Sequence, residues 1–246
     1  MRTNRGYIWI LAFCCFFQNC YFEPEDEQSP KLEIFFYTPG SDDAIDDSVF
    51  YADGTVMANI KVKVSPAIRP IENRKISLST TLGSFLVDGE FKKSFELVLN
   101  SDGEGEVWYA APLAPGDAYL KLSSINSIVT ATKKMTFEPA LPEMVEIETP
   151  FRILKDSSNT VVSVRMKRTS GRVSVGLYPD FKLVSFENDD EEVKNSTFFK
   201  ISPSDSSGQS SCTLVLEKPN PGKYLIQVSF KGLDDIRWTH QIEVTN

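Results

Sequence analysis

One pattern occurs twice in this chain, and it limits the fold more than any other feature. Each copy has a polar turn ending in glycine, a strand-like run, and a Pro-Gly pair that opens a strand bearing a tyrosine. Similarity at a long fixed spacing is typical of tandem units, so the pattern predicts two copies of one β module. The turn glycines are assigned to Gly105 and Gly208, and the Pro-Gly pairs are Pro115-Gly116 and Pro221-Gly222.

Short runs of alternating apolar and polar residues support this prediction. In residues 59–64, the side chains of Ile60, Val62 and Val64 share one face, as in a half-buried strand of an antiparallel sheet. Similar runs recur in both units between turn-forming residues, and no stretch after residue 30 has a helical period with caps. Many short strands separated by turns are typical of β-sandwiches. We predict an all-β fold of two tandem immunoglobulin-like β-sandwiches.

The composition fits two globular units and argues against nucleic acid as a partner. An apolar content of 41% is ordinary for a folded protein and too high for a disordered one. The formal charge is -8, and loss of residues 1–19, which carry Arg2 and Arg5 and no acid, lowers it to -10. Phosphate backbones need Lys and Arg to neutralise them, so we expect no binding to DNA, RNA or anionic lipid surfaces.

The first 19 residues are predicted to be an export signal. Arg2 and Arg5 precede an apolar run at residues 7–17, which is much shorter than the about 20 residues that cross a bilayer. The predicted organisation is a signal peptide at 1–19, an acidic linker at 20–30, a first sandwich at 31–139 and a second at 140–246.

Cys20 stands where the apolar run meets the polar linker, and this junction resembles the lipobox of bacterial lipoproteins. In that motif the cysteine is acylated and becomes the mature N-terminus, so the resemblance implies a membrane anchor at Cys20. Residues 17–19 depart from the usual Leu, small residue, and Gly or Ala before the cysteine. The alternative is cleavage by an ordinary signal peptidase, but no A-x-A-like site lies near Cys20.

Three segments of the first unit resemble a known family. They are A-D-G-T at residues 52–55, T-T-x-G at residues 80–83, and the turn at residues 101–105. In this order they resemble the bacterial immunoglobulin-like domains of the invasin and intimin group. The resemblance covers residues 50–135 well and residues 143–246 weakly, and it implies the sandwich fold more than any function.

Few residues point to catalysis. His240 is the one histidine, so a His-rich zinc site cannot be assembled, and a Ser-His-Asp triad has one candidate base. Cys212 is the one cysteine left outside the leader and Cys20, and its spacing to Leu214 and Leu216 predicts a buried strand residue. No motif for a nucleophile elbow, a phosphate loop or a zinc protease occurs. We predict no catalytic residues and no enzyme activity.

Acidic clusters raise calcium as a candidate ligand. Asp42, Asp43, Asp46 and Asp47 form one cluster, and residues 187–192 form another. Calcium prefers such hard oxygen ligands, but neither cluster has EF-hand spacing. The alternative is a solvated loop whose charges discourage aggregation.

Trp108 and Tyr109 form a candidate contact site. They are adjacent on an alternating run, so one of the two must point outward if the strand is regular. Tryptophan is enriched at binding hot spots, which makes this strand a candidate binding surface.

These observations lead to one hypothesis and two alternatives. The hypothesis is a lipid-anchored protein of the bacterial envelope, at the outer membrane, that acts as an adhesin-like or protein-interaction module with a protein or glycan ligand. One alternative is a periplasm-facing structural or assembly lipoprotein. The other is a calcium- or carbohydrate-binding module.

Overall fold

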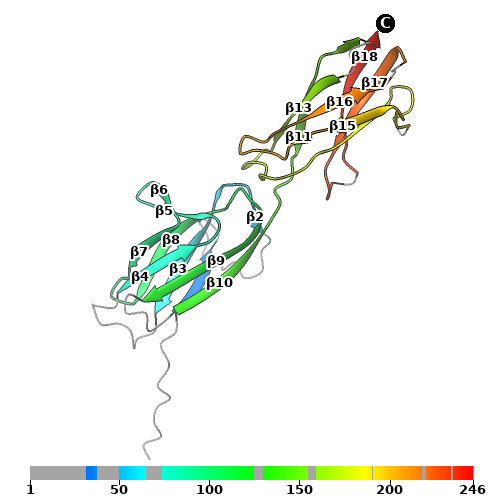
Figure 1. Ribbon diagram of the computed structural model, residues 1–246. Coiled ribbons are helices and arrows are strands. Elements are labelled where there is room, and N and C mark those ends of the chain that lie inside the picture. The colour runs from blue at the N-terminus through cyan, green and yellow to red at the C-terminus, as the bar shows by residue number, and fades with distance from the viewer. Residues whose placement is uncertain are drawn as a thin grey trace, which may run out of the picture.

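Every regular element in the described part of the chain is a β-strand (Figure 1). The structure is a computed structural model. It describes residues 32–37, 50–64, 74–124, 130–154, 159–189, 191–217, 220–233 and 235–245. These residues include no helix of the length and apolarity that a membrane crossing requires. The all-β prediction is therefore confirmed.

Two sheets built from the first strands of the chain form the first sandwich. Their orders are β1-β3-β8-β5-β6 and β2-β10-β9-β4-β7. The strands are β1 (Leu32–Tyr37), β2 (Phe50–Tyr51), β3 (Val56–Val64), β4 (Lys75–Thr80), β5 (Ser84–Val87), β6 (Glu90–Lys92), β7 (Ser94–Val98), β8 (Glu104–Ala110), β9 (Gly116–Ser124) and β10 (Thr130–Glu138).

The remaining strands form a second sandwich with two four-stranded sheets. The sheet orders are β11-β13-β16-β15 and β12-β18-β17-β14. The strands are β11 (Met144–Glu148), β12 (Arg152–Leu154), β13 (Asn159–Lys167), β14 (Asp180–Ser185), β15 (Ser196–Phe199), β16 (Gln209–Leu216), β17 (Gly222–Ser229) and β18 (Trp238–Thr245).

Both sandwiches use the same pairing scheme. In each, a first strand pairs antiparallel in one sheet, as β1 does with β3 and β11 with β13. The short strand that follows pairs in parallel with the last strand of the other sheet, as β2 does with β10 and β12 with β18. Two facing, mainly antiparallel sheets with this pairing of the first strands are typical of immunoglobulin-like sandwiches, with five strands in each sheet of the first domain and four in each sheet of the second.

Period-two alternation places the apolar side chains between the sheets. On β9, Ala118, Leu120 and Leu122 are buried while Tyr119 and Lys121 are exposed. The predicted face of β3 is as expected, with Ile60, Val62 and Val64 inside, and on β18 the alternate residues Ile242 and Val244 are buried in the second core. Each sandwich therefore has its own core of interleaved side chains, as the patterns predicted.

The repeated turn is present in both sandwiches, but one of its glycines was assigned wrongly. The Asn100 side chain accepts from the backbone N–H groups of Asp102 and Glu104, and Gly103 has a positive φ of 78°. The Asp205 side chain accepts from Ser207 and Gln209 in the same way, and Gly208 has a φ of 74°. The counterpart of Gly208 is therefore Gly103, since Gly105 lies inside β8. Sequence spacing alone could not show which glycine needs the left-handed conformation.

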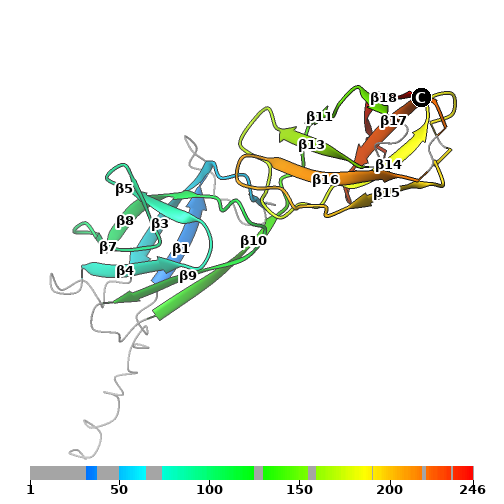
Figure 2. The same cartoon turned by 45° about the horizontal axis from the view of Figure 1, so that its top comes forward.

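The sandwiches lie end to end, joined where β10 leads into β11 (Figures 1 and 2). Ser174 of the second sandwich is completely buried at this junction. Its hydroxyl donates to the Ala52 carbonyl at 2.7 Å and accepts from the Ala140 N–H at 2.8 Å. One side chain thus bonds to the first sandwich and to the connecting segment together.

Backbone bonds on either side of Ser174 strengthen this junction. The Arg172 N–H donates to the Asp53 carbonyl, and the Val175 N–H donates to the Leu113 carbonyl, each at 2.9 Å. Nearby, the Arg168 guanidinium carbon lies 5.9 Å from the centre of the Tyr51 ring. Because these bonds come from several loops of the first sandwich, they oppose both bending and twisting of the second.

The A-D-G-T segment forms the first sandwich's part of this junction. The Asp53 carboxylate accepts from the N–H and the hydroxyl of Thr55. Gly54 has a φ of 74°, and a Cβ there would lie 2.8 Å from a Leu113 methyl carbon. The motif is thus a tight turn that presents the Asp53 carbonyl to the second sandwich.

Cys212 is buried in the second core, as predicted. Burial raises the pKa of its thiol to about 12 from the ordinary 9.0. At pH 8 we expect the native mature chain, with Cys20→Ser, to react with an aromatic disulfide reagent about a thousandfold more slowly than the unfolded chain, because thiolate is the reactive form. Absorbance of the released thiol measures this rate. Equal rates in the native and unfolded chains would show that Cys212 is accessible.

Candidate functional site

The pleat of β8 sends Tyr109 inward and Trp108 outward. Tyr109 has no exposed surface, whereas Trp108 is 39% exposed. The structure therefore corrects half of the predicted contact pair, because a residue inside the core cannot touch a partner. Trp108 alone remains a candidate binding residue.

Tyr109 instead holds a corner of the first sandwich together. Its hydroxyl donates to the Leu82 carbonyl and lies 3.2 Å from the Thr80 hydroxyl, which also donates to that carbonyl. Gly83 has a φ of 67°, and a Cβ there would come within 2.2 Å of the Tyr109 hydroxyl. The T-T-x-G segment is thus a backbone turn that accommodates the tyrosine hydroxyl, which gives the motif a structural role.

Trp108 belongs to an apolar row across the outer face of its sheet. Trp108 on β8 is directly opposite Leu86 on β5, which is directly opposite Phe91 on β6. Phe91 is 62% exposed, and Leu86 is half-buried between the two aromatic residues. Directly opposed residues have their Cβ atoms about 5 Å apart, so the three side chains form one strip. We call this strip the Trp108 row.

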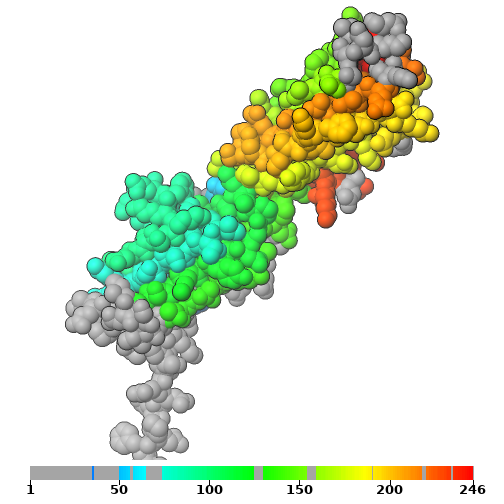
Figure 3. Space-filling model, in the orientation of Figure 1, coloured from blue at the N-terminus to red at the C-terminus, as the bar shows by residue number. Residues whose placement is uncertain are grey.

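The β5–β6 hairpin projects from the body of the first sandwich (Figures 1 and 3). Its turn contains Asp88 and Gly89, with φ values of 54° and 79°. Two positive φ values identify a type I′ turn, which matches the twist of the strands it joins. The turn keeps the hairpin tight, so Phe91 is held on a rigid projection.

Charged residues beside the Trp108 row are paired with one another. Lys61 lies 3.7 Å from Glu106, and Lys63 lies 2.9 Å from Glu104, between β3 and β8. These exposed pairs add little stability, but they leave the rim without a dominant charge. The surface therefore has an apolar centre and a neutral polar rim, as protein interfaces do.

The acidic segment at residues 187–192 folds back on the second sandwich. The Ser185 N–H donates to the Glu191 carbonyl, and the Val193 N–H donates to the Leu183 carbonyl. The Gln227 side-chain amide donates to the Asp189 carbonyl at 2.9 Å. The backbone of this segment is thus tied to the sheet, while its described acidic side chains are exposed.

Among the described residues, no group of three or more His, Cys, Asp or Glu is arranged to hold a metal ion. The aspartates Asp42, Asp43, Asp46 and Asp47 lie outside the described residues, as does Cys20. His240 is half-buried on β18, and its Nε2 has no hydrogen-bond partner in the part of the chain described.

No protein-family model and no curated protein matches this sequence. Among solved structures, the chain is similar to the adhesin InvE of Yersinia pseudotuberculosis, with a TM-score of 0.58 and 12% identity, over 89% of this chain and 59% of InvE. It is also similar to InvD of the same organism, with a TM-score of 0.40 and 14% identity, over 80% of this chain and 54% of InvD.

A third similar structure is invasin, a bacterial integrin-binding protein. Its TM-score is 0.42 at 15% identity, over 88% of this chain and 40% of invasin. The chain thus spans less than two thirds of any of these proteins. The likeness to InvE confirms the resemblance to invasin- and intimin-type immunoglobulin-like domains at the level of the fold.

Proposed function

We propose that this chain is a non-catalytic envelope protein that presents two immunoglobulin-like domains as an adhesin-like or protein-interaction module. Three observations support this. The fold is that of InvE, an adhesin. The junction at Ser174 joins the domains firmly, and the Trp108 row is exposed on a projecting hairpin. The proposal rests mainly on the Trp108 row, because its exposed aromatic side chains lie outside the hydrophobic core and are available to a partner.

An acyl anchor at Cys20 would hold this module at the membrane. Two or more acyl chains bind a membrane stably where a single chain is marginal. The acidic linker at residues 20–30 would then separate the first sandwich from the lipid surface. The second sandwich would be presented farther out, since the C-terminus lies at the end away from the first sandwich (Figure 1).

Mass spectrometry of the mature N-terminus and protease shaving of intact cells test this placement. We expect a peptide that starts at an acylated Cys20, and cleavage of both sandwiches by external protease. A mature chain that starts elsewhere would contradict the anchor. Complete protection from protease would contradict display on the cell surface.

Removing the aromatic residues of the Trp108 row tests the surface itself. We expect Trp108→Ala and Phe91→Ala each to weaken attachment of the mature protein to target cells about thirtyfold, because buried hot-spot aromatics contribute ~2 kcal/mol or more. Titrated binding of fluorescent protein to cells measures this.

The matched control is Tyr119→Ala, which removes an exposed aromatic residue from the opposite sheet. Circular dichroism would show that all three variants are folded. Equal binding by the Trp108 and Tyr119 variants would contradict a role for the Trp108 row.

A sheet edge favours the alternative of an envelope-assembly lipoprotein. Among the described residues, β7 pairs with β4 on one side and forms the edge of its sheet. Val98 on this edge is 64% exposed. Such an edge accepts a partner strand by main-chain hydrogen bonds. Cross-linking from Glu96 to envelope proteins, with attachment to cells unaffected by Trp108→Ala, would support assembly over adhesion.

A further inference from the structure

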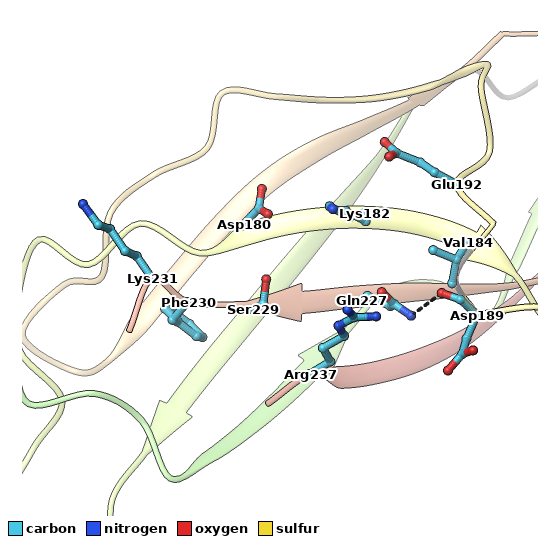
Figure 4. Close-up of a pocket in the computed structure, with 10 residues that line it drawn as sticks. All are labelled: Asp180, Lys182, Val184, Asp189, Glu192, Gln227, Ser229, Phe230, Lys231 and Arg237. Carbon is cyan, nitrogen blue, oxygen red and sulfur yellow. Dashed lines mark hydrogen bonds between the residues drawn. The ribbon is translucent and has the colours of Figure 1, made fainter. Parts of the chain in front are cut away.

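The outer face of the second sandwich carries a hollow of about 540 Å³ (Figure 4). Its floor is formed by Asp180 and Lys182 of β14 and by Gln227 and Ser229 of β17. Asp189 and Glu192 of the acidic segment line one side of the hollow. The volume lies within the range of about 300–1,000 Å³ that is usual for ligand sites.

The hollow contains a polar side chain, that of Gln227, which is buried and held in place by a hydrogen bond. Gln227 is on the outer face of its sheet, where a polar side chain is normally in water, yet it is only 5% exposed. Its amide nitrogen donates to the Asp189 carbonyl at 2.9 Å. This bond orients the side chain before any ligand arrives, and a preorganised polar group loses less entropy on binding.

The charges that line the hollow balance one another. They are Asp180, Asp189 and Glu192 against Lys182, Lys231 and Arg237. A ligand with a single charge sign would gain from one set and lose to the other. An apolar ligand would remove these charged groups from water without replacing their hydrogen bonds. A ligand that suits the hollow therefore carries many hydrogen-bond donors and acceptors and little net charge.

Addition of a peptide strand is blocked along the C-terminal part of β14. There Val184 forms an antiparallel bridge with Glu192, and the N–H groups of Ser185 and Val193 donate to the Glu191 and Leu183 carbonyls. Val184 is 2% exposed as a result. A peptide strand cannot pair with a backbone edge that is already paired. Hydroxyl groups, by contrast, both donate to carboxylates and accept from ammonium and amide groups.

We infer that this hollow is a binding site for a neutral oligosaccharide. Sugar hydroxyls bond to the Lys182 ammonium, to the carboxylates of Asp180 and Glu192, and to the Gln227 amide. The site is in the second sandwich, on a different domain from the Trp108 row, and its function does not depend on that row.

The test is a titration of the ¹⁵N-labelled mature chain with neutral oligosaccharides, namely oligomannose and N-acetyllactosamine chains, followed by nuclear magnetic resonance. We expect at least one of them to shift the side-chain amide of Gln227 and the backbone amides of β14 and β17. Lys182→Ala and Glu192→Gln should each weaken this binding about tenfold, because each removes a charged hydrogen-bond partner.

Matched controls are Lys121→Ala and Glu96→Gln, which change the same residue types at exposed strand positions of the first sandwich. The inference is overturned if none of these saccharides shifts the Gln227 amide. Shifts near Trp108 instead, or shifts at Gln227 with a peptide and with no saccharide, also overturn it. The attachment test with Trp108→Ala has a separate readout, so each proposal can fail without the other.

Discussion

Replacing Tyr109 by alanine is expected to unfold the first sandwich at physiological temperature while the second remains folded. Tyr109 is fully buried, and its ring centroid lies 5.7 Å from that of Phe85 and 6.4 Å from that of Phe137. Removing a buried aromatic side chain costs about 3–5 kcal/mol, which is comparable to the stability of a small domain. Calorimetry would show the transition of the first sandwich lost or shifted far downward. An unchanged transition would contradict this role.

Tyr109→Phe is the matched variant, since it keeps the ring and removes only the hydroxyl. We expect a loss of roughly 1–2 kcal/mol, because the Leu82 carbonyl loses a buried hydrogen-bond partner. A loss as large as that of the alanine variant would mean that the hydroxyl, and not the ring, stabilises the corner.

The hydroxyl of Tyr109 also predicts the response to alkali. Burial raises its pKa to about 12 from the ordinary 10.0, and this outweighs the opposite effect of the bond with Thr80. A raised folded-state pKa means that the stability is fully present below pH 10 and is lost as the pH rises toward 12. Unfolding in urea between pH 9 and pH 12 should therefore show a falling midpoint for the first sandwich. In Tyr109→Phe that fall should be smaller, and an equal fall would exclude Tyr109 as its source.

Replacing Ser174 by alanine is expected to uncouple the two sandwiches. The change leaves the Ala52 carbonyl without the hydroxyl donor and the Ala140 N–H without its acceptor, both at a buried junction. Each lost partner costs about 1–3 kcal/mol. We expect the thermal transitions of the two domains to separate and the ¹⁵N relaxation rates to give two different tumbling times.

Ser210→Ala is the control for Ser174→Ala. Ser210 is also buried, and its hydroxyl donates to the Ser202 carbonyl within the second sandwich. We expect Ser210→Ala to lower the stability of the second sandwich and to leave the common tumbling time of the two domains unchanged. Independent tumbling of the domains in the unaltered protein would contradict a rigid junction.

Local alternation predicted the core of both domains correctly. A strand residue faces the same side as its neighbours two positions away, so the inward faces of β3, β9 and β18 follow from short stretches of sequence. The same rule predicted that either Trp108 or Tyr109 faces outward. It could not say which one, because the register of β8 depends on its pairing with β3 and β5.

The interaction surfaces could not be read from local patterns. The Trp108 row needs β8 and the β5–β6 hairpin to align across a sheet, and the sequence marks only its Asp-Gly turn. The hollow at Gln227 needs the acidic segment to fold back over β14 and β17. That segment suggested either calcium or a solvated loop, and its main role here depends on backbone bonds that composition does not reveal.

By itself, the sequence established the all-β fold, the repeated turn and the burial of Cys212, because these depend on residues close together along the chain. Tertiary structure alone decided that Gly103 is the turn glycine, that Tyr109 is a core residue, and that Ser174 joins the domains. These features depend on hydrogen bonds and side-chain contacts between distant segments. Only folding brings the donor and acceptor of such a bond together, so no local pattern can predict them.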